Sequence, residues 1–293
     1  MHNKRSIQGV SFLVVATLSH ALYGVFSRII GIGFGQFFQI VARSSILLIF
    51  FGITILLQKN WKTINKSDYK WFVLMIIPGL IALASMFTAF NYLPLGTVLF
   101  TYYAVSALCG YLLGALLFKE KLDRVKLISL ILCFFGLYIF FSGSIRLGNT
   151  LYLSFACLAG LGAAAWNIVS KKISDTYPTS EILVMDSLLM VLVGLPISLL
   201  LHERVSLPSF TLPWLGILGY SVAAIGSSVF TIKGFKYLQA QIGSLVMLLE
   251  PVIGAFLGWL LYKEVLTFQA GIGAIIILIG ISLPNLKQTK ELK

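Results

Sequence analysis

Long apolar stretches alternate with short polar segments along the whole chain. A helix that crosses a bilayer needs about 20 mostly apolar residues, and ten stretches meet that requirement. The predicted helices cover residues 7–29, 35–58, 71–91, 96–118, 126–143, 149–170, 180–201, 212–232, 241–262 and 268–285. The connections between them are too short to hold a soluble domain. The pattern therefore predicts an all-α polytopic membrane protein with ten transmembrane helices.

Composition agrees with this interpretation. The 293 residues are 58% hydrophobic and only 11% charged, whereas soluble domains carry about 25% charged residues. The formal net charge of +12 could indicate nucleic-acid binding, but the basic residues lie in the short loops between apolar stretches. We therefore expect membrane lipids and a small-molecule substrate as partners, and no nucleic acid.

The distribution of Lys and Arg predicts the orientation. With the N-terminus placed in the cytoplasm, the loops on that side hold most of the basic residues, and the opposite side holds only Arg28, Arg146, Arg204 and Lys263. Cytoplasmic loops of membrane proteins carry such an excess. We expect a multi-pass protein of the plasma membrane with both termini in the cytoplasm.

The chain repeats itself at half its length. Residues 102–122 match residues 246–266 at an offset of 144, and the first helices of the two halves match at an offset of 143. The matched pairs are Gly110 and Gly254, Gly114 and Gly258, Lys119-Glu120 and Lys263-Glu264, Tyr23 and Trp166, and Arg28 and Lys171. Two repeats, 1–147 and 148–293, follow. Because five helices is an odd number, the repeats must be inverted, an arrangement typical of secondary transporters whose substrate site lies where the repeats meet.

The matched segments resemble a known family. The segment EPVIGAFLGWLLYKE (250–264), the Tyr23-Gly24 pair, Arg43 in the second helix and the segment FNYLPLGT (90–97) are similar to the repeats of EamA-type members of the drug/metabolite transporter superfamily. The halves depart from the pattern at a few positions. Ser106-Ala107 stands where Glu250-Pro251 stands, Trp166-Asn167 replaces the aromatic-Gly pair, and Asp186 aligns with Arg43.

The resemblance implies secondary transport of a small metabolite, with amino acids, amines, carboxylates and nucleotide-linked metabolites as substrate classes. It also implies a cavity lined by helices 1, 3, 4, 6, 8 and 9. The chain has no G-x-x-x-x-G-K-[ST] motif for binding ATP phosphates. We therefore expect transport driven by a gradient, with a proton or a counter-substrate as the coupling partner, and no cofactor or metal.

Polar side chains inside the spans are the candidate site residues, because a charge at the bilayer centre costs on the order of 2.5–3.5 kcal/mol. The candidates for the cavity or for coupling are His20, Tyr23, Arg43, Tyr103, Trp166, Asn167, Asp186 and Glu250. Glu250 could carry a proton or bind a cationic group, or it could hold helices together by pairing with an Arg. The adjacent Pro251 predicts a kink in the ninth helix.

The other candidates also have two interpretations each. Arg43 could clamp a substrate carboxylate, but we favour an internal ion pair with Asp186 or Glu250. His20 could take part in proton coupling or make a structural hydrogen bond. The aromatic residues Tyr23, Tyr103 and Trp166 could line a cavity or a helix interface, and Asn167 is expected to pack helices.

Taken together, these features favour a secondary active transporter that works by alternating access. A substrate with a carboxylate and an ammonium group would use Arg43 and Glu250 together, so an amino acid or a related compound is the expected substrate, and export is the expected direction. A lipid or lipid-linked sugar flippase on the same fold is the alternative. An intramembrane enzyme is disfavoured, since the chain has no H-E-x-x-H or G-x-S-x-G motif.

Overall fold

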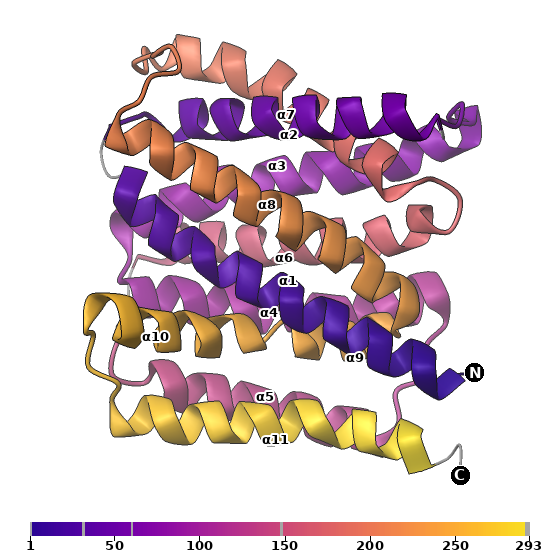
Figure 1. Ribbon diagram of the computed structural model, residues 1–293. Helices are drawn as coiled ribbons and strands as arrows, with labels where there is room; N and C mark the ends of the chain where they lie inside the picture. The colour runs from indigo at the N-terminus through magenta and orange to yellow at the C-terminus, as the bar shows by residue number, and fades with distance from the viewer. Residues whose placement is uncertain (1, 31–32, 60, 147–148, 291–293) are drawn as a thin grey trace.

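The computed structural model describes residues 2–30, 33–59, 61–146 and 149–290, and every regular element in these ranges is a helix. Figure 1 shows them as a bundle of long rods that run roughly alongside one another. The elements are α1 (His2–Ile30), α2 (Gln36–Gln58), the short η1 (Lys66–Asp68), α3 (Tyr69–Tyr92), α4 (Leu95–Phe118), α5 (Arg124–Phe141), α6 (Thr150–Ser174), α7 (Thr179–Leu200), α8 (Leu212–Tyr237), α9 (Ala240–Val246), α10 (Leu249–Tyr262) and α11 (Phe268–Lys290).

The ten predicted spans all correspond to helices. Within the described residues, nine segments are long and apolar enough to cross a membrane, and one of these, Ala240–Tyr262, combines α9 with α10. The tenth span is the shorter apolar part of α11, Phe268–Pro284. The all-helical membrane fold predicted from hydropathy is confirmed. The expected boundary between the repeats, at residues 147–148, lies outside the described residues.

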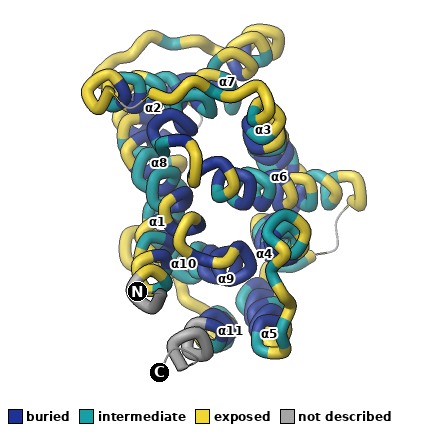
Figure 2. The backbone as a smooth tube through the Cα atoms, turned by 90° about the vertical axis from the view of Figure 1, so that its right-hand side faces the viewer, coloured by how far each residue is buried: buried dark blue, intermediate teal, exposed yellow. Residues whose placement is uncertain are grey.

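The packing of the helices follows the two-repeat layout. The most extensive contacts join α1 to α8, α3 to α6, α5 to α11 and α2 to α7. The repeats match α1 with α6, α2 with α7, α3 with α8 and α5 with α11, while α4 matches the span made of α9 and α10. Under this match the α1–α8 contact corresponds to the α6–α3 contact, and the α2–α7 and α5–α11 contacts each correspond to themselves. The helices of the two halves are therefore interleaved rather than separate, as Figure 2 also shows. Both chain termini lie at the same end of the bundle (Figure 1).

The ninth span is interrupted one turn before its proline. A residue at position 251 would normally donate its backbone N–H to the carbonyl of Met247, but Pro251 has no N–H and its ring crowds that carbonyl. The backbone N–H of Glu250 donates to the Met247 carbonyl instead, at 3.1 Å, and Leu248 N–H donates to Leu245, at 3.0 Å. These shorter-range bonds separate α9 from α10. The disturbance expected at Pro251 is therefore present, and it places Glu250 in the first turn of α10.

Candidate functional site

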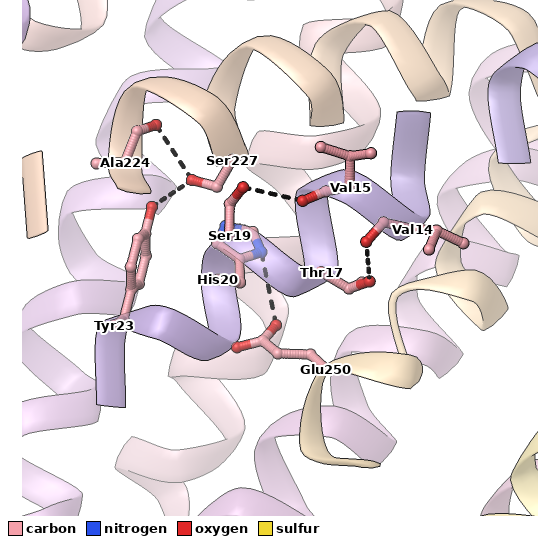
Figure 3. Close-up of polar contacts among 9 residues, drawn as sticks. All are labelled: Val14, Val15, Thr17, Ser19, His20, Tyr23, Ala224, Ser227 and Glu250. Carbon is pink, nitrogen blue, oxygen red and sulfur yellow. Dashed lines mark hydrogen bonds and ion pairs between the residues drawn. The ribbon is translucent and has the colours of Figure 1, made fainter. Parts of the chain in front are cut away.

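Glu250 meets His20 beside the interruption of the ninth span. The Oε2 atom of Glu250 lies 3.6 Å from Nδ1 of His20 on α1, which is longer than a hydrogen bond but close enough for an ion pair when the imidazole is protonated. The Nδ1 atom has no hydrogen-bond partner among the described residues. About a fifth of each side chain stays accessible, 22% for His20 and 21% for Glu250. Figure 3 shows the two side chains pointing toward each other.

Tyrosines of α4 reach the same carboxylate. The hydroxyl of Tyr103 interacts with the carboxyl group of Glu250, and the Tyr103 side chain is buried. The ring of Tyr102 packs edge-on against that of Tyr103, with centroids 5.0 Å apart, and Tyr102 also interacts electrostatically with Glu250. Glu250 of the second half therefore lies against His20 and Tyr103 of the first half.

An aromatic row leads away from His20. The imidazole contacts the ring of Tyr23 at 5.1 Å between centroids, and Tyr23 stacks on Tyr220 of α8 at 4.3 Å. The Tyr23 hydroxyl hydrogen-bonds to Ser227, whose hydroxyl donates to the carbonyl of Ala224 at 3.1 Å (Figure 3). This bond leaves the oxygen of Ser227 as an acceptor, so Tyr23 is the donor and the orientation of its ring is fixed.

Arg43 ends this row, and the ion pair that we favoured from the sequence is not formed. Its guanidinium carbon lies 5.1 Å from the ring centroid of Tyr220, within cation–π range. Within the described part of the chain, no carboxylate comes within 4.0 Å of Arg43. Glu250 instead lies beside His20 and Tyr103. Asp186 is close enough to Arg43 for its charge to act on the carboxylate, but the two side chains do not form an ion pair.

Trp166 and Asp186 form a second polar contact. The indole Nε1–H of Trp166 on α6 donates to Oδ1 of Asp186 on α7, at 3.0 Å. The indole lies against Gly79 of α3, where an added Cβ would come within 2.8 Å of the ring. A glycine is therefore needed at this position for the indole to reach Asp186. The neighbouring Asn167 side chain has no polar partner in the described residues and does not join either group.

The structure thus connects five of the predicted residues and pairs two others. The connected row is His20, Tyr23, Arg43, Tyr103 and Glu250, and the separate pair is Trp166 with Asp186. Sequence reasoning missed two members of the row, Tyr220 and Ser227 of α8. They are seven residues apart, which places them on one face of a helix, and this spacing of two hydroxyl groups within a single span was the signal that could have identified them.

An all-helical bundle of interleaved halves, with an interrupted span that presents a carboxylate to the opposite half, is typical of polytopic membrane transporters built from inverted repeats. The comparisons with known proteins name its family. The model of the EamA-like transporter family matches residues 7–142 and again residues 150–286. The two matches fall on the two repeats and cover most of the chain. The chain belongs to the EamA-like transporter family.

The fold also occurs among solved structures. The chain is similar to a protein whose description reads "Crystal structure of protein", with a TM-score of 0.79 and 16% sequence identity over 97% of this chain and 99% of that one. At this identity the likeness concerns the fold alone. No curated protein matched the sequence significantly.

Proposed function

We propose that this protein is a secondary active transporter of a small zwitterionic metabolite, an amino acid or a closely related compound. Arg43 carries the proposal. Its guanidinium lies between helices, over Tyr220, with no carboxylate within 4.0 Å among the described residues. A charge inside a membrane protein calls for a partner, and a substrate carboxylate can bind a guanidinium through two parallel hydrogen bonds.

The opposite end of the row suits the other charge of the substrate. Glu250 is partly accessible, and its carboxylate can accept hydrogen bonds from an ammonium group. The rings between the two ends, those of Tyr23 and Tyr220, offer faces that attract a cation and cover apolar surface. Carboxylate recognition at one end and ammonium recognition at the other select a zwitterion over a simple anion or cation.

The contact between His20 and Glu250 supports coupling to protons. A protonated Glu250 has lost the negative charge that would hold an ammonium group, so a proton and the substrate compete for the same carboxylate. Competition for one site produces exchange of the two ligands by alternating access. Because protons enter a cell down their gradient, exchange against protons supports export as the direction of transport.

We place the protein in the plasma membrane with both termini in the cytoplasm. The support is the common end of the bundle at which both termini lie (Figure 1), together with the excess of basic residues in the loops at that end. Single cysteines introduced into exposed loops test the orientation. Lys66 and Arg204 are exposed and lie in loops assigned to opposite sides, so a reagent that cannot cross the membrane should label only the residue-204 position in intact cells.

Counterflow in proteoliposomes tests the proposed substrate. Vesicles that contain purified protein and an excess of unlabelled amino acid should accumulate the labelled compound, and Arg43→Gln and Glu250→Gln should abolish this accumulation. Arg204→Gln, which removes an exposed loop charge, is the matched control and should behave as the unmodified protein. If no amino acid shows counterflow, and labelled lipids instead cross the bilayer faster, the flippase alternative is correct.

A further inference from the structure

The helices α4 and α10 end in the same backbone turn. Lys119 and Lys263, which are 144 residues apart, both adopt left-handed backbone conformations, with φ of 55° and 56°. The next residue then donates its N–H back into the helix, Glu120 to Gly114 and Glu264 to Gly258, each at 3.3 Å. The backbone therefore places Glu120 and Glu264 equivalently at the ends of their helices. If the two side chains bind different partners, the cause lies in the surrounding helices and not in the turn.

Glu120 binds the start of the interrupted span. Its two carboxylate oxygens accept the backbone N–H groups of Ala240, at 2.6 Å, and Gln241, at 3.0 Å. These first N–H groups of a helix have no partner within the helix, and the N-cap residue of α9, Gln239, supplies no side-chain bond. The Glu120 carboxylate therefore ties the end of α4 to the start of α9.

Close packing accompanies this bond. An added Cβ at Gly110 would come 1.9 Å from the Ser244 hydroxyl, and one at Gly114 would come 3.1 Å from Gln241. The absence of a side chain at these two glycines therefore lets α4 pack directly onto α9. Lys171 of α6 binds the end of α8, which directly precedes α9, because its Nζ donates to the carbonyl of Phe235, at 2.9 Å, and to that of Leu238. We call this contact of α4 with α9 the closed seam.

The equivalent positions of the second half are not engaged in this way. An added Cβ at Gly254 would meet nothing within 4 Å, and one at Gly258 would meet only the Glu264 side chain. Glu264 pairs with Arg28, the repeat equivalent of Lys171, and Arg28 also lies over the ring of Tyr262, at 4.3 Å.

The start of α4, which is the repeat equivalent of the start of α9, is also without this contact. Its N-cap residue Pro94 supplies no side-chain hydrogen bond, and the described backbones of α4 and α10 stay apart along most of their length, although the side chains of Tyr103 and Glu250 meet. We call the unmade contact between α10 and the start of α4 the open seam.

We infer that Glu120 and Glu264 are alternating latches, and that the present structure is the state in which only the Glu120 latch is closed. In the opposite state, Glu264 leaves Arg28 and accepts the first N–H groups of α4, while Gly254 and Gly258 pack against α4 and Glu120 releases α9. The inference rests on the proposed alternating access. It assigns the closed seam to the end of the bundle that holds both termini, where α9 lies (Figure 1).

Distances between spin labels in lipid nanodiscs test the latches without any measurement of transport. Leu95 and Val265 flank the open seam, and their repeat equivalents Gln239 and Lys121 flank the closed seam; all four are exposed. Cysteines for labelling are introduced in pairs after Cys109, Cys133 and Cys157 are replaced by Ala. Each label pair then reports the opening of one seam.

The two latch variants should shift the distances in opposite directions. Glu120→Gln should lengthen the 121–239 distance and shorten the 95–265 distance, with a change of about tenfold in the population ratio, because two charge-assisted bonds become weaker. Glu264→Gln should favour the present state, and the double variant should return toward the unmodified distribution. The adjacent substitutions Lys119→Gln and Lys263→Gln remove a charge but no latch, so they serve as controls.

Identical distance distributions in both latch variants, or shifts in the same direction, would overturn the inference. If Glu120→Gln does not fold, Glu264→Gln alone still decides, because it must abolish any population with a short 95–265 distance. Transport by the same variants separates this question from the proposed function. If the protein shows amino-acid counterflow but the label distances do not change in the latch variants, only the latch inference is refuted. If the distances change as expected but no amino acid is transported, only the proposed substrate is refuted.

Discussion

Nδ1 of His20 lies 3.6 Å from Oε2 of Glu250, across the contact between the first helix of one repeat and the interrupted helix of the other. The pair combines an imidazole, a side chain that can bind and release a proton, with a carboxylate that Tyr103 of the first half also contacts. The pair therefore links the protonation of one residue to contacts between the two halves. Protonation and the relative position of the halves are the two quantities that a coupled transporter has to connect.

Substitution of either partner should impair transport that is driven by the proton gradient. We expect Glu250→Gln to reduce pH-gradient-driven transport at least tenfold, because a neutral amide carries no proton between the two sides. His20→Gln should have a smaller effect, and it should add nothing in the Glu250→Gln background, since residues in direct contact are not additive. Initial rates for the four proteins, with and without the gradient, provide the test. Purely additive losses would mean that the pair does not act as a unit.

Arg43→Lys should weaken substrate binding although it keeps the positive charge. A lysine lacks the planar fork that binds a carboxylate through two bonds and stacks on an aromatic ring, and Arg43 lies over Tyr220. We expect the affinity to fall about tenfold, which corresponds to the loss of about 1.4 kcal/mol. Tyr220→Phe keeps the ring and should bind nearly normally, while Tyr220→Leu should resemble Arg43→Lys. Isothermal titration with the transported amino acid measures all three, and equal affinities for Arg43→Lys and the unmodified protein would contradict the proposed clamp.

The sequence was sufficient to predict the spans and the repeats. Hydropathy adds up over about 20 residues, so one polar residue such as Glu250 does not hide a span. The offset of 144 between Gly110 and Gly254 continues to Lys119 and Lys263, which end α4 and α10 in the same left-handed turn. The hydropathy signal depends on residues that are close together in the chain. The repeat signal depends on a comparison of two such segments.

The partners of the charged residues were not predictable in the same way. Glu250 lies beside His20 and not beside Arg43, and this choice depends on how α1, α2 and α10 are rotated about their axes. Rotation is decided by contacts between distant residues, such as the stacking of Tyr23 on Tyr220. The different partners of Glu120 and Glu264 were hidden for another reason, since the local sequences of the two positions are alike and only the distant groups that face them differ.

The bond between Trp166 and Asp186 should contribute to stability. Asp186→Leu leaves the partly buried indole N–H without its acceptor, so we expect the free energy of unfolding to fall by about 1–3 kcal/mol. Asp186→Asn keeps an oxygen that can accept the same bond and should cost less. Unfolding in detergent, followed by tryptophan fluorescence, compares the two variants, with Trp166→Phe as a third that removes the donor and leaves four of the five tryptophans as the signal. A smaller loss for Leu than for Asn would show that this bond is not the stabilising contact.

Pro251→Ala should convert α9 and α10 into one continuous helix. An alanine at position 251 has the backbone N–H that a regular helix uses to bond to the carbonyl of Met247. The N–H of Glu250, which now donates to that carbonyl, is then free to take its own regular partner. The new bond is worth about 1 kcal/mol, but the loss of the proline makes the unfolded chain freer by about 0.4–1 kcal/mol, so net stability should hardly change. Hydrogen exchange at residues 247–251 should slow, and transport should also slow because Glu250 is held on a stiffer helix. Pro196→Ala, inside the uninterrupted α7, is the control, and an equal loss of transport in both variants would show that the interruption has no special role.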